Sequence, residues 1–216
     1  MKTLFALALL SGLASAAQAQ TDIKAGTVQL GGNVGYFRNS LESPTNNGSY
    51  YYSKATTTNS QFSVAPSVGF FVADNLAVGI SGSYQMFHSK YNESVGVTSE
   101  LKSKQYQIGA FVQYYKMVTE QFGFTGTLGG GYQYAENFYT GSPPTKGAYA
   151  NLTPGLVFFP IPKLAIGASI GGLNYTYASY KAPDSFNSSE TYHSSSFGAN
   201  FGLSQLLFSG TYYFGR

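Results

Sequence analysis

The side chains that could carry out nucleophilic or metal chemistry are few in this sequence. Cysteine is absent, so a Cys-based zinc site is impossible, and the two histidines, His88 and His193, lie at the edges of long polar segments. Ser89 and Ser194 follow them, and a Ser–His pair can supply a nucleophile and its base. Adjacent residues on a strand face opposite sides, so neither pair can act by itself. We therefore expect no catalytic, metal or cofactor site, and no enzymatic activity.

The composition excludes other classes of protein. The chain has 216 residues with 26 glycines, 19 tyrosines and 17 phenylalanines, and only 10% of its residues are charged, against about a quarter in an ordinary soluble domain. The runs Gly31-Gly32 and Gly129-Gly130-Gly131 lack the Lys-Ser/Thr pair and the helix that follow a phosphate-binding loop. The net charge of +3 is too small and too scattered for a nucleic-acid partner.

The N-terminus has the pattern of an export signal. A short basic start at Lys2 precedes an apolar stretch over residues 4–13, and Ala17-Gln18-Ala19 fits the small-x-small cleavage rule. The sequence predicts a cleaved signal peptide over residues 1–19 and a single domain over residues 20–216. Polar residues interrupt every later apolar run well before the ~20 residues of a membrane-spanning helix.

Beyond the signal peptide, apolar and polar residues alternate with a period of two, which is typical of strands with two different faces. In the first such segment, Val28 and Leu30 alternate with Gln29 and Gly31. The alternation predicts eight strands, over residues 27–36, 61–70, 76–86, 105–114, 122–134, 149–158, 164–171 and 194–214.

The last predicted strand changes phase. Its apolar residues are odd-numbered up to Leu203 and even-numbered from Leu206 onward. A β-bulge near Ser204-Gln205 would insert one residue and flip the phase, whereas a turn there would give nine strands. We favour the bulge, because an even number of strands brings both termini to the same side of a membrane.

The predicted connections alternate between two kinds. Short turns fall at residues 73–75, 118–120 and 160–163, and long Ser-, Asn- and Tyr-rich loops at residues 38–59, 88–104, 136–146 and 177–193. Short turns at one end and long loops at the other are the layout of an outer-membrane barrel. Pro66 and Pro154 interrupt two strands, where we expect a bulge or a kink.

The placement of charge distinguishes a membrane barrel from a soluble one. Nearly all charged residues lie in loops, turns and strand ends, and a lipid-facing Lys or Arg at mid-depth would cost about 2–4 kcal/mol. Aromatic residues mark two girdles, one beside the short turns and one toward the loops. The first contains residues 70–71, 114–115, 122 and 158–159, and the second Tyr36, Tyr84, Tyr106, Tyr132, Tyr134 and Tyr175.

The other face of the predicted strands is rich in uncharged amides, and an eight-stranded interior is about wide enough for side chains alone. We expect a packed, hydrogen-bonded lumen without ion pairs. Its side chains would be Gln29, Asn33, Gln61, Gln85, Gln105, Gln107, Gln113, Gln133 and Asn151, with Phe87, Phe111, Tyr115 and Tyr149.

Two further motifs support this layout. The run from Pro66 to Gly79, with Phe70-Phe71 and Leu76-Ala77, recurs 88 residues later from Pro154 to Gly167, and the chain ends on Phe208-x-Gly210-x-Tyr212-x-Phe214 before two more residues. These motifs resemble the small outer-membrane β-barrel family, the porin-family barrels of the OmpA-, OmpX- and OmpW-like, Bacteroidetes type. The resemblance implies an outer-membrane location and assembly by the barrel-assembly machinery, which reads the last strand.

The expected fold is all-β, an eight-stranded antiparallel up-and-down transmembrane β-barrel in the cell outer membrane. We expect a structural or surface-interaction role through the extracellular loops. The alternative is a narrow passive channel for small or hydrophobic solutes, and a lipid-modifying enzyme is less favoured. The expected partners are outer-membrane lipid, lipopolysaccharide and, during biogenesis, the barrel-assembly machinery, and we expect a monomer.

Overall fold

The computed structural model describes residues 22–46, 52–93, 98–136, 143–181 and 190–216. The predicted signal peptide lies outside these residues. The described chain forms eight strands: β1 (Val28–Asn46), β2 (Tyr52–Ala73), β3 (Leu76–Glu93), β4 (Thr98–Met117), β5 (Phe122–Glu136), β6 (Thr145–Ile161), β7 (Leu164–Lys181) and β8 (Thr191–Phe214). Among the described residues, no helix has the length and hydropathy needed to cross a membrane.

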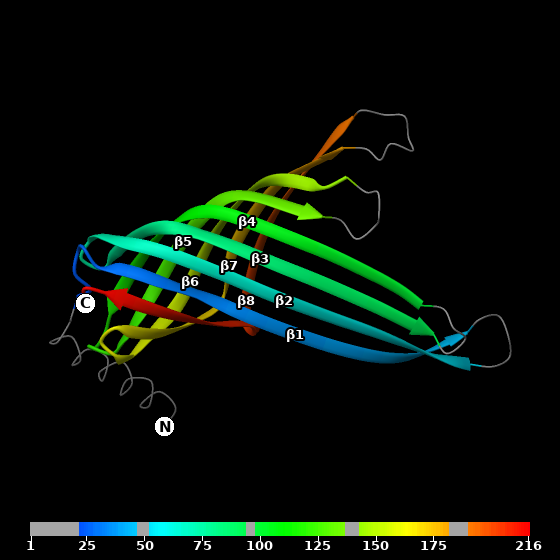
Figure 1. Ribbon diagram of the computed structural model, residues 1–216, viewed down its shortest axis with the longest axis horizontal. Coiled ribbons are helices and arrows are strands. Elements are labelled where there is room, and N and C mark those ends of the chain that lie inside the picture. Colours follow the sequence, from blue (N-terminus) through cyan, green and yellow to red (C-terminus); the bar gives the residue numbers. More distant parts are fainter. Residues whose placement is uncertain (1–21, 47–51, 94–97, 137–142, 182–189) are drawn as a thin grey trace, which may run out of the picture.

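The eight strands form a closed up-and-down barrel. Each strand pairs antiparallel with the next one along the chain, and β8 pairs with β1 (Figure 1). The short connections join β2 to β3, β4 to β5 and β6 to β7, where they were predicted, and the C-terminus lies at the same end. The predicted fold class and strand number are therefore confirmed.

The strands are longer than the alternation predicted. They contain 15 to 24 residues, whereas about 9–11 residues suffice for a tilted strand to cross a bilayer. The loops predicted over residues 38–59 and 88–104 are mostly strand, since β1 continues to Asn46 and β3 to Glu93. This part of the prediction was wrong because the strands continue to pair beyond the membrane. Water can solvate both faces of a strand there, so its side chains need not alternate between apolar and polar. Figure 1 shows these extensions as two groups, β1–β4 and β5–β8, that diverge from the barrel.

The two prolines in the strands have different effects on pairing. Opposite Pro154 the β6–β7 register shifts by one residue, from Leu152 opposite Leu173 to Gly155 opposite Ser169. The extra residue lies on β7, and β6 keeps its register with β5 through Pro154, so the bulge predicted at Pro154 lies in the neighbouring strand instead. At Pro66 the β2–β3 ladder is interrupted but keeps its register on both sides. The interruption is consistent with a proline nitrogen that cannot donate a hydrogen bond.

The predicted phase flip in the last segment is present, and β8 remains one strand. Phe201 pairs with Gly171 and Leu206 pairs with Ile170, so residues 202–205 have no partner on β7. The bulge is therefore larger than the single residue expected. β7 flips its phase at the same height, where Gly171 adopts a φ of 99°, a conformation that favours glycine. The sequence analysis missed this matching flip in β7.

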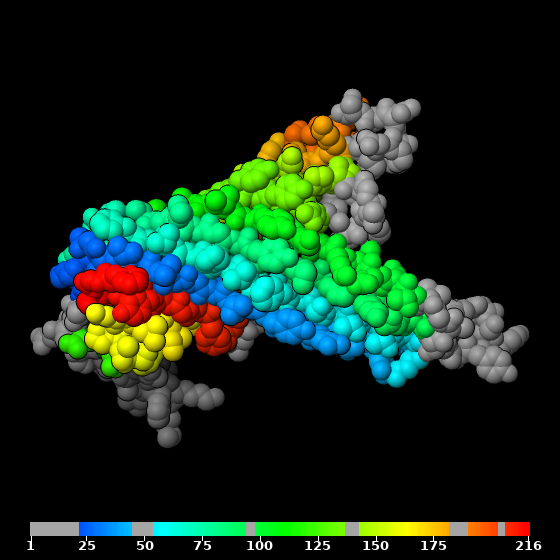
Figure 2. Space-filling view, in the orientation of Figure 1, coloured from blue at the N-terminus to red at the C-terminus, as the bar shows by residue number. Residues whose placement is uncertain are grey.

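The seam between β1 and β8 is short. Only Val28–Gly32 pair with Phe214–Gly210, whereas β7 and β8 pair along nearly their whole length. Figure 2 shows the red end of β8 against blue β1 at the end of the barrel that carries the short turns. Beyond Gly32, β1 pairs with β2 alone among the described residues.

Candidate functional site: the closed base and the polar lumen

The end of the barrel that carries the short turns is filled by large side chains. Phe71, Tyr115, Met117, Phe159 and Tyr213 point inward there, and each is at most 2% exposed. We call these five residues the base plug. Their rings pack with centroids 5.2 to 6.4 Å apart, in the tilted and edge-on arrangements that aromatic pairs prefer. The plug closes the lumen at this end.

The base plug corrects part of the predicted girdle. In each aromatic doublet, one ring faces outward and the next faces inward: Phe70 is 48% exposed, while Phe71 is fully buried. Phe158 and Phe159 repeat the arrangement. The period of two contains this information, because adjacent residues must face opposite sides. Toward the loops, four of the predicted tyrosines, Tyr36, Tyr106, Tyr132 and Tyr175, are 40–69% exposed, and Tyr106 lies between Tyr84 and Tyr134 at centroid distances of 5.2 and 6.1 Å.

A layer of hydrogen bonds lies at the base plug and satisfies its polar atoms. The Tyr115 hydroxyl lies 2.7 Å from Gln29 Oε1, 2.9 Å from Gln113 Oε1 and 3.0 Å from the Tyr213 hydroxyl. The Gln29 amide donates to Gln113 at 3.0 Å. This layer confirms the predicted amide-rich lumen at these positions and joins β1, β4 and β8.

The residues before β1 cross the base as a strap, which we define as residues 22–27. Ile23 is fully buried and belongs to the same apolar cluster as the base plug. Its backbone pairs with Asn75, since Asn75 N donates to Ile23 O and Ile23 N donates to Asn75 Oδ1, both at 2.9 Å. The Asn75 side-chain amide thus substitutes for a peptide group in a β-bridge. The sequence analysis missed this contact, because the two residues are 52 positions apart.

Asn75 uses its remaining groups as well. Its Nδ2 donates to Asp22 Oδ1 at 2.6 Å, and its carbonyl accepts from Tyr115 N at 2.9 Å. Its φ of 63° lies in the left-handed region, where asparagine is among the better-tolerated residues. Asn75 therefore clamps the strap to β2–β3 and to β4.

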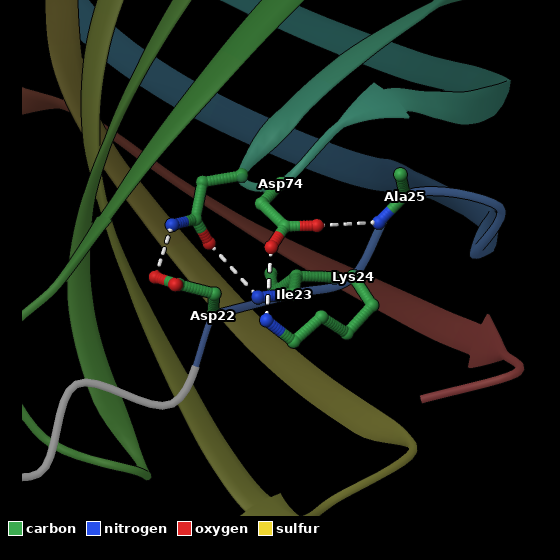
Figure 3. Close-up of polar contacts among 6 residues, drawn as sticks. Asp22, Ile23, Lys24, Ala25 and Asp74 are labelled. Carbon is green, nitrogen blue, oxygen red and sulfur yellow. Dashed lines mark hydrogen bonds and ion pairs between the residues drawn. The ribbon is translucent and has the colours of Figure 1, made fainter.

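Asp74 adds a second attachment for the strap (Figure 3). Its two carboxylate oxygens accept from Lys24 Nζ at 2.8 Å and from Ala25 N at 2.9 Å. The hydrogen bond from Lys24, with that from Ala25, lowers the pKa of Asp74, and the same contact with Asp74 raises the pKa of Lys24. Both side chains are exposed, so this ion pair contributes less than the Asn75 clamp.

The C-terminal residue covers the opposite side of the base. Gly215 turns the chain with a φ of 91°, and the Arg216 guanidinium lies 3.5 Å from the centre of the Phe159 ring. Arg216 also donates to Glu120 O at 3.2 Å and reaches Pro162 O at 3.5 Å. The strap and Arg216 together contact all three short turns. The two residues after Phe214, which sequence analysis could only note, thus have a structural role.

Above the base, the lumen contains open space between neutral polar side chains. Two adjoining cavities, of about 250 and 290 Å³, share Asn33, Gln113, Thr127, Asn151 and Ser209 as lining residues. The expected dense packing therefore holds at the base but not in the middle of the barrel. A second amide layer lies further toward the loops, where Gln107 bonds to Ser83 at 3.1 Å and to Gln133 at 3.4 Å.

Inward-facing glycines make room for the larger lumen side chains. A Cβ at Gly79 would lie 2.6 Å from Phe111 Cζ and 2.7 Å from Gly69 Cα. Asn151 lies over Gly129 in a similar way, with its Oδ1 2.5 Å from the position of a Cβ there. The glycines therefore determine which side chains fill the lumen.

The structure does not bring the two histidines together. His88 contacts Glu100 across β3–β4 at 2.6 Å, while His193 on β8 stacks on Tyr177 with its Nδ1 2.9 Å from the tyrosine hydroxyl. Among the described residues, no group of three or more His, Asp or Glu side chains could hold a metal ion.

The outer wall has the opposite character. Outward-facing apolar side chains are exposed on every strand, among them Val34 at 68%, Ile80 at 62% and Ile108 at 65%. Backbone groups in hydrocarbon must be satisfied within the protein, and among β structures a barrel achieves this by closing on itself. The closed sheet, the apolar outside and the polar inside define a transmembrane β-barrel of the outer-membrane class.

Solved structures of that class resemble this chain. The OprG outer-membrane protein of Pseudomonas aeruginosa is 18% identical, with a TM-score of 0.49 over 89% of this chain and 98% of its own. Outer membrane protein W of E. coli is 15% identical, with a TM-score of 0.42 over 88% and 99%. The Yersinia pestis outer-membrane protein Ail, in complex with a heparin analogue, is 18% identical, with a TM-score of 0.36 over 88% and 99%. No protein-family model and no curated protein sequence matches the chain.

Proposed function

We propose that this protein is a non-conducting, non-catalytic outer-membrane barrel that acts through its extracellular end. The observation that carries the proposal is the base plug, whose five side chains are each at most 2% exposed and lie across the lumen. The strap covers the plug and holds Ile23 against it. A pore that is closed by packed rings and a covering segment cannot pass hydrated ions. The long extensions of the strands then offer the surface on which the protein acts.

The partners that fit this proposal are those of an embedded surface protein. Lipid covers the apolar wall, lipopolysaccharide surrounds the extracellular extensions, and the assembly machinery inserts the chain, which we propose to be monomeric. The strand extensions carry opposite charges in neighbouring pairs, such as Lys54 with Glu42 and Lys102 with Glu100. These pairs lie on exposed surface, so they contribute little to the stability of the barrel. Their role in this proposal is to set the charges that the extracellular end presents to its partners.

Planar-bilayer conductance of the refolded chain tests the proposal. We expect no discrete current steps from the native protein. The double variant Tyr115→Ala, Tyr213→Ala removes two rings of the base plug and should produce steps, whereas Tyr114→Ala, Tyr212→Ala removes two outward rings from the same strands and should not. Folding of each variant is checked by its heat-dependent gel mobility. Discrete steps from the native protein would overturn the proposal.

The short β1–β8 seam favours a second candidate, a passive route for small or hydrophobic solutes. The lumen would open sideways into the membrane above Gly32 and Gly210, where the pairing of β1 with β8 ends. Continuing that register places Val34 opposite Phe208, and the chain contains no other cysteine to interfere with a Val34→Cys, Phe208→Cys cross-link. Solute uptake into vesicles that is lost on oxidation and restored by reduction would support this route. Uptake that is unchanged by the cross-link would exclude it.

A further inference from the structure

The two adjoining lumen cavities form one uncharged hollow with both polar and apolar lining, which we call the cup. Gln113 and Tyr115 of the hydrogen-bonded layer at the base line its lower part, and the layer around Gln107 lies toward the loops. Gln107 and Gln113 are six residues apart on β4, which is about 15 Å along the barrel axis for a tilted strand. The cup is therefore deep enough for a small molecule. It is closed below because the base is closed, so the inference rests on that part of the proposed function.

The lining of the cup excludes charged solutes. Among the residues that the structure describes, no Asp, Glu, Lys, Arg or His side chain lines either cavity. The barrel wall around the cup is surrounded by lipid, and an ion placed there without a partner would lose hydration that nothing in the lining replaces. A positively or negatively charged solute should therefore be rejected.

The lining also excludes a purely apolar solute. The side-chain amides of Asn33 and Asn151 face the cup, and within the described part of the chain no hydrogen bond engages either of them. Each amide has two donor hydrogens and an acceptor oxygen. Thr127 and Ser209 add hydroxyl groups to the same space. Filling the cup with hydrocarbon would leave these groups unsatisfied, at a cost that a solute with its own donors and acceptors avoids.

Apolar and aromatic side chains form the rest of the wall of the cup, among them Phe111 and Tyr149 in one cavity and Leu156, Val157 and Leu207 in the other. Phe111, which is 8% exposed, lies across Gly69 and Gly79, and the Tyr149 hydroxyl approaches Gly109. Ligand sites commonly combine such apolar surfaces with a few converging polar groups. We propose that the cup binds an uncharged, polyhydroxylated solute of about the size of a monosaccharide. Its hydroxyl groups both donate and accept hydrogen bonds, as the amides and hydroxyls of the lining require.

Titration calorimetry on the full chain, refolded in lipid nanodiscs, tests this inference with three probes of the same carbon skeleton. We expect heat of binding from glucose and none from gluconate or from protonated glucosamine at the same concentrations. Equal binding of the charged probes would overturn the inference, because the uncharged lining would then not discriminate between neutral and charged solutes. Absence of glucose binding to verified folded protein would also overturn it.

Variants locate the site. Asn33→Leu and Asn151→Leu each remove one amide from the cup, and each should weaken glucose binding about tenfold, which corresponds to the loss of one or two hydrogen bonds. The control is Asn39→Leu, on the same strand and face as Asn33 but outside the cup. An equal effect of Asn39→Leu, or no effect of the two cup variants, would contradict the assignment. Conductance measured in parallel separates the two proposals, since current steps report a failed base and absent binding reports a failed cup.

Discussion

The two ends of the barrel are built in different ways. At the base, buried side chains, a satisfied hydrogen-bond layer, the strap and Arg216 hold seven strands and all three short turns together. At the loop end, the strands extend as exposed hairpins whose contacts are surface ion pairs and stacked rings, such as Tyr180 on Tyr192. Since burial makes an interaction costly to lose, substitutions at the base should destabilise the protein more than comparable ones at the other end.

The largest expected loss of stability comes from a substitution in the closely packed lumen wall around Phe111. Gly79→Val should destabilise the barrel by about 3 kcal/mol, because the new side chain meets Phe111 and the backbone of Gly69. Gly126→Val is the control, since a Cβ there meets nothing within 4 Å. Urea titration in vesicles measures both. A Gly79→Val variant as stable as the control would refute the packing argument.

A smaller loss is expected when one hydroxyl is removed from the base. Tyr115→Phe keeps the ring but deprives Gln29 and Gln113 of a hydrogen-bond partner, which should cost about 1–3 kcal/mol. At the loop end, Tyr180→Phe should change the free energy of unfolding by less than about 0.5 kcal/mol. The same urea titration compares them, and equal losses would show that the two ends do not differ as described.

Asn75→Asp tests the clamp rather than the whole barrel. The new carboxylate cannot donate to Asp22 and repels it, so the strap should detach more often while the barrel stays folded. The expected result is about tenfold faster trypsin cleavage after Lys24, because cleavage follows the population of the open form. Asn75→Gly keeps the backbone conformation without the amide and should give a similar acceleration. Cleavage as slow as in the native chain would mean that Ile23 alone holds the strap.

The smallest effect concerns the ion pair between Lys24 and Asp74. The lowered pKa of Asp74 contributes stability that is present above the ordinary aspartate value of about 3.9 and is lost as the pH falls through the lowered value. The raised pKa of Lys24 contributes stability that is fully present below the ordinary lysine value of about 10.4. This stability is lost only at higher pH. The strap should therefore be insensitive to pH between these limits.

The amide chemical shift of Ala25, which donates to Asp74, measures this pH dependence. We expect one transition below about pH 3.9, and Asp74→Asn should remove it. A transition near neutral pH would contradict the assignment.

Much of the fold could be predicted because strand periodicity is a local property. The alternation of Val28 and Leu30 with Gln29 and Gly31 already indicates which side chains face lipid and which face the lumen, and the same reasoning places Gln29 and Gln113 inside. It could also have separated Phe71 from Phe70, had the parity been applied within the doublets. The strand ends were predicted less well, because pairing outside the membrane does not require alternating side chains.

Other features depend on contacts between distant parts of the chain. Ile23 and Asn75 meet only after β1 and β2 have paired, and Arg216 finds Phe159 and the two turns only once the barrel has closed. The number of residues that pair between β1 and β8 also depends on distant parts of the chain. It depends on the change of phase that β7 and β8 make together, at Gly171 and at residues 202–205.

The sequence by itself determined the class of fold, the number of strands, the apolar outside and the neutral inside, because each follows from residue type and a period of two. Only the tertiary structure decided that the base is closed, that the two ends of the described chain secure it, and that the middle of the lumen stays open. Those properties depend on how eight strands bring side chains from different positions into one cross-section, and no local pattern specifies that arrangement.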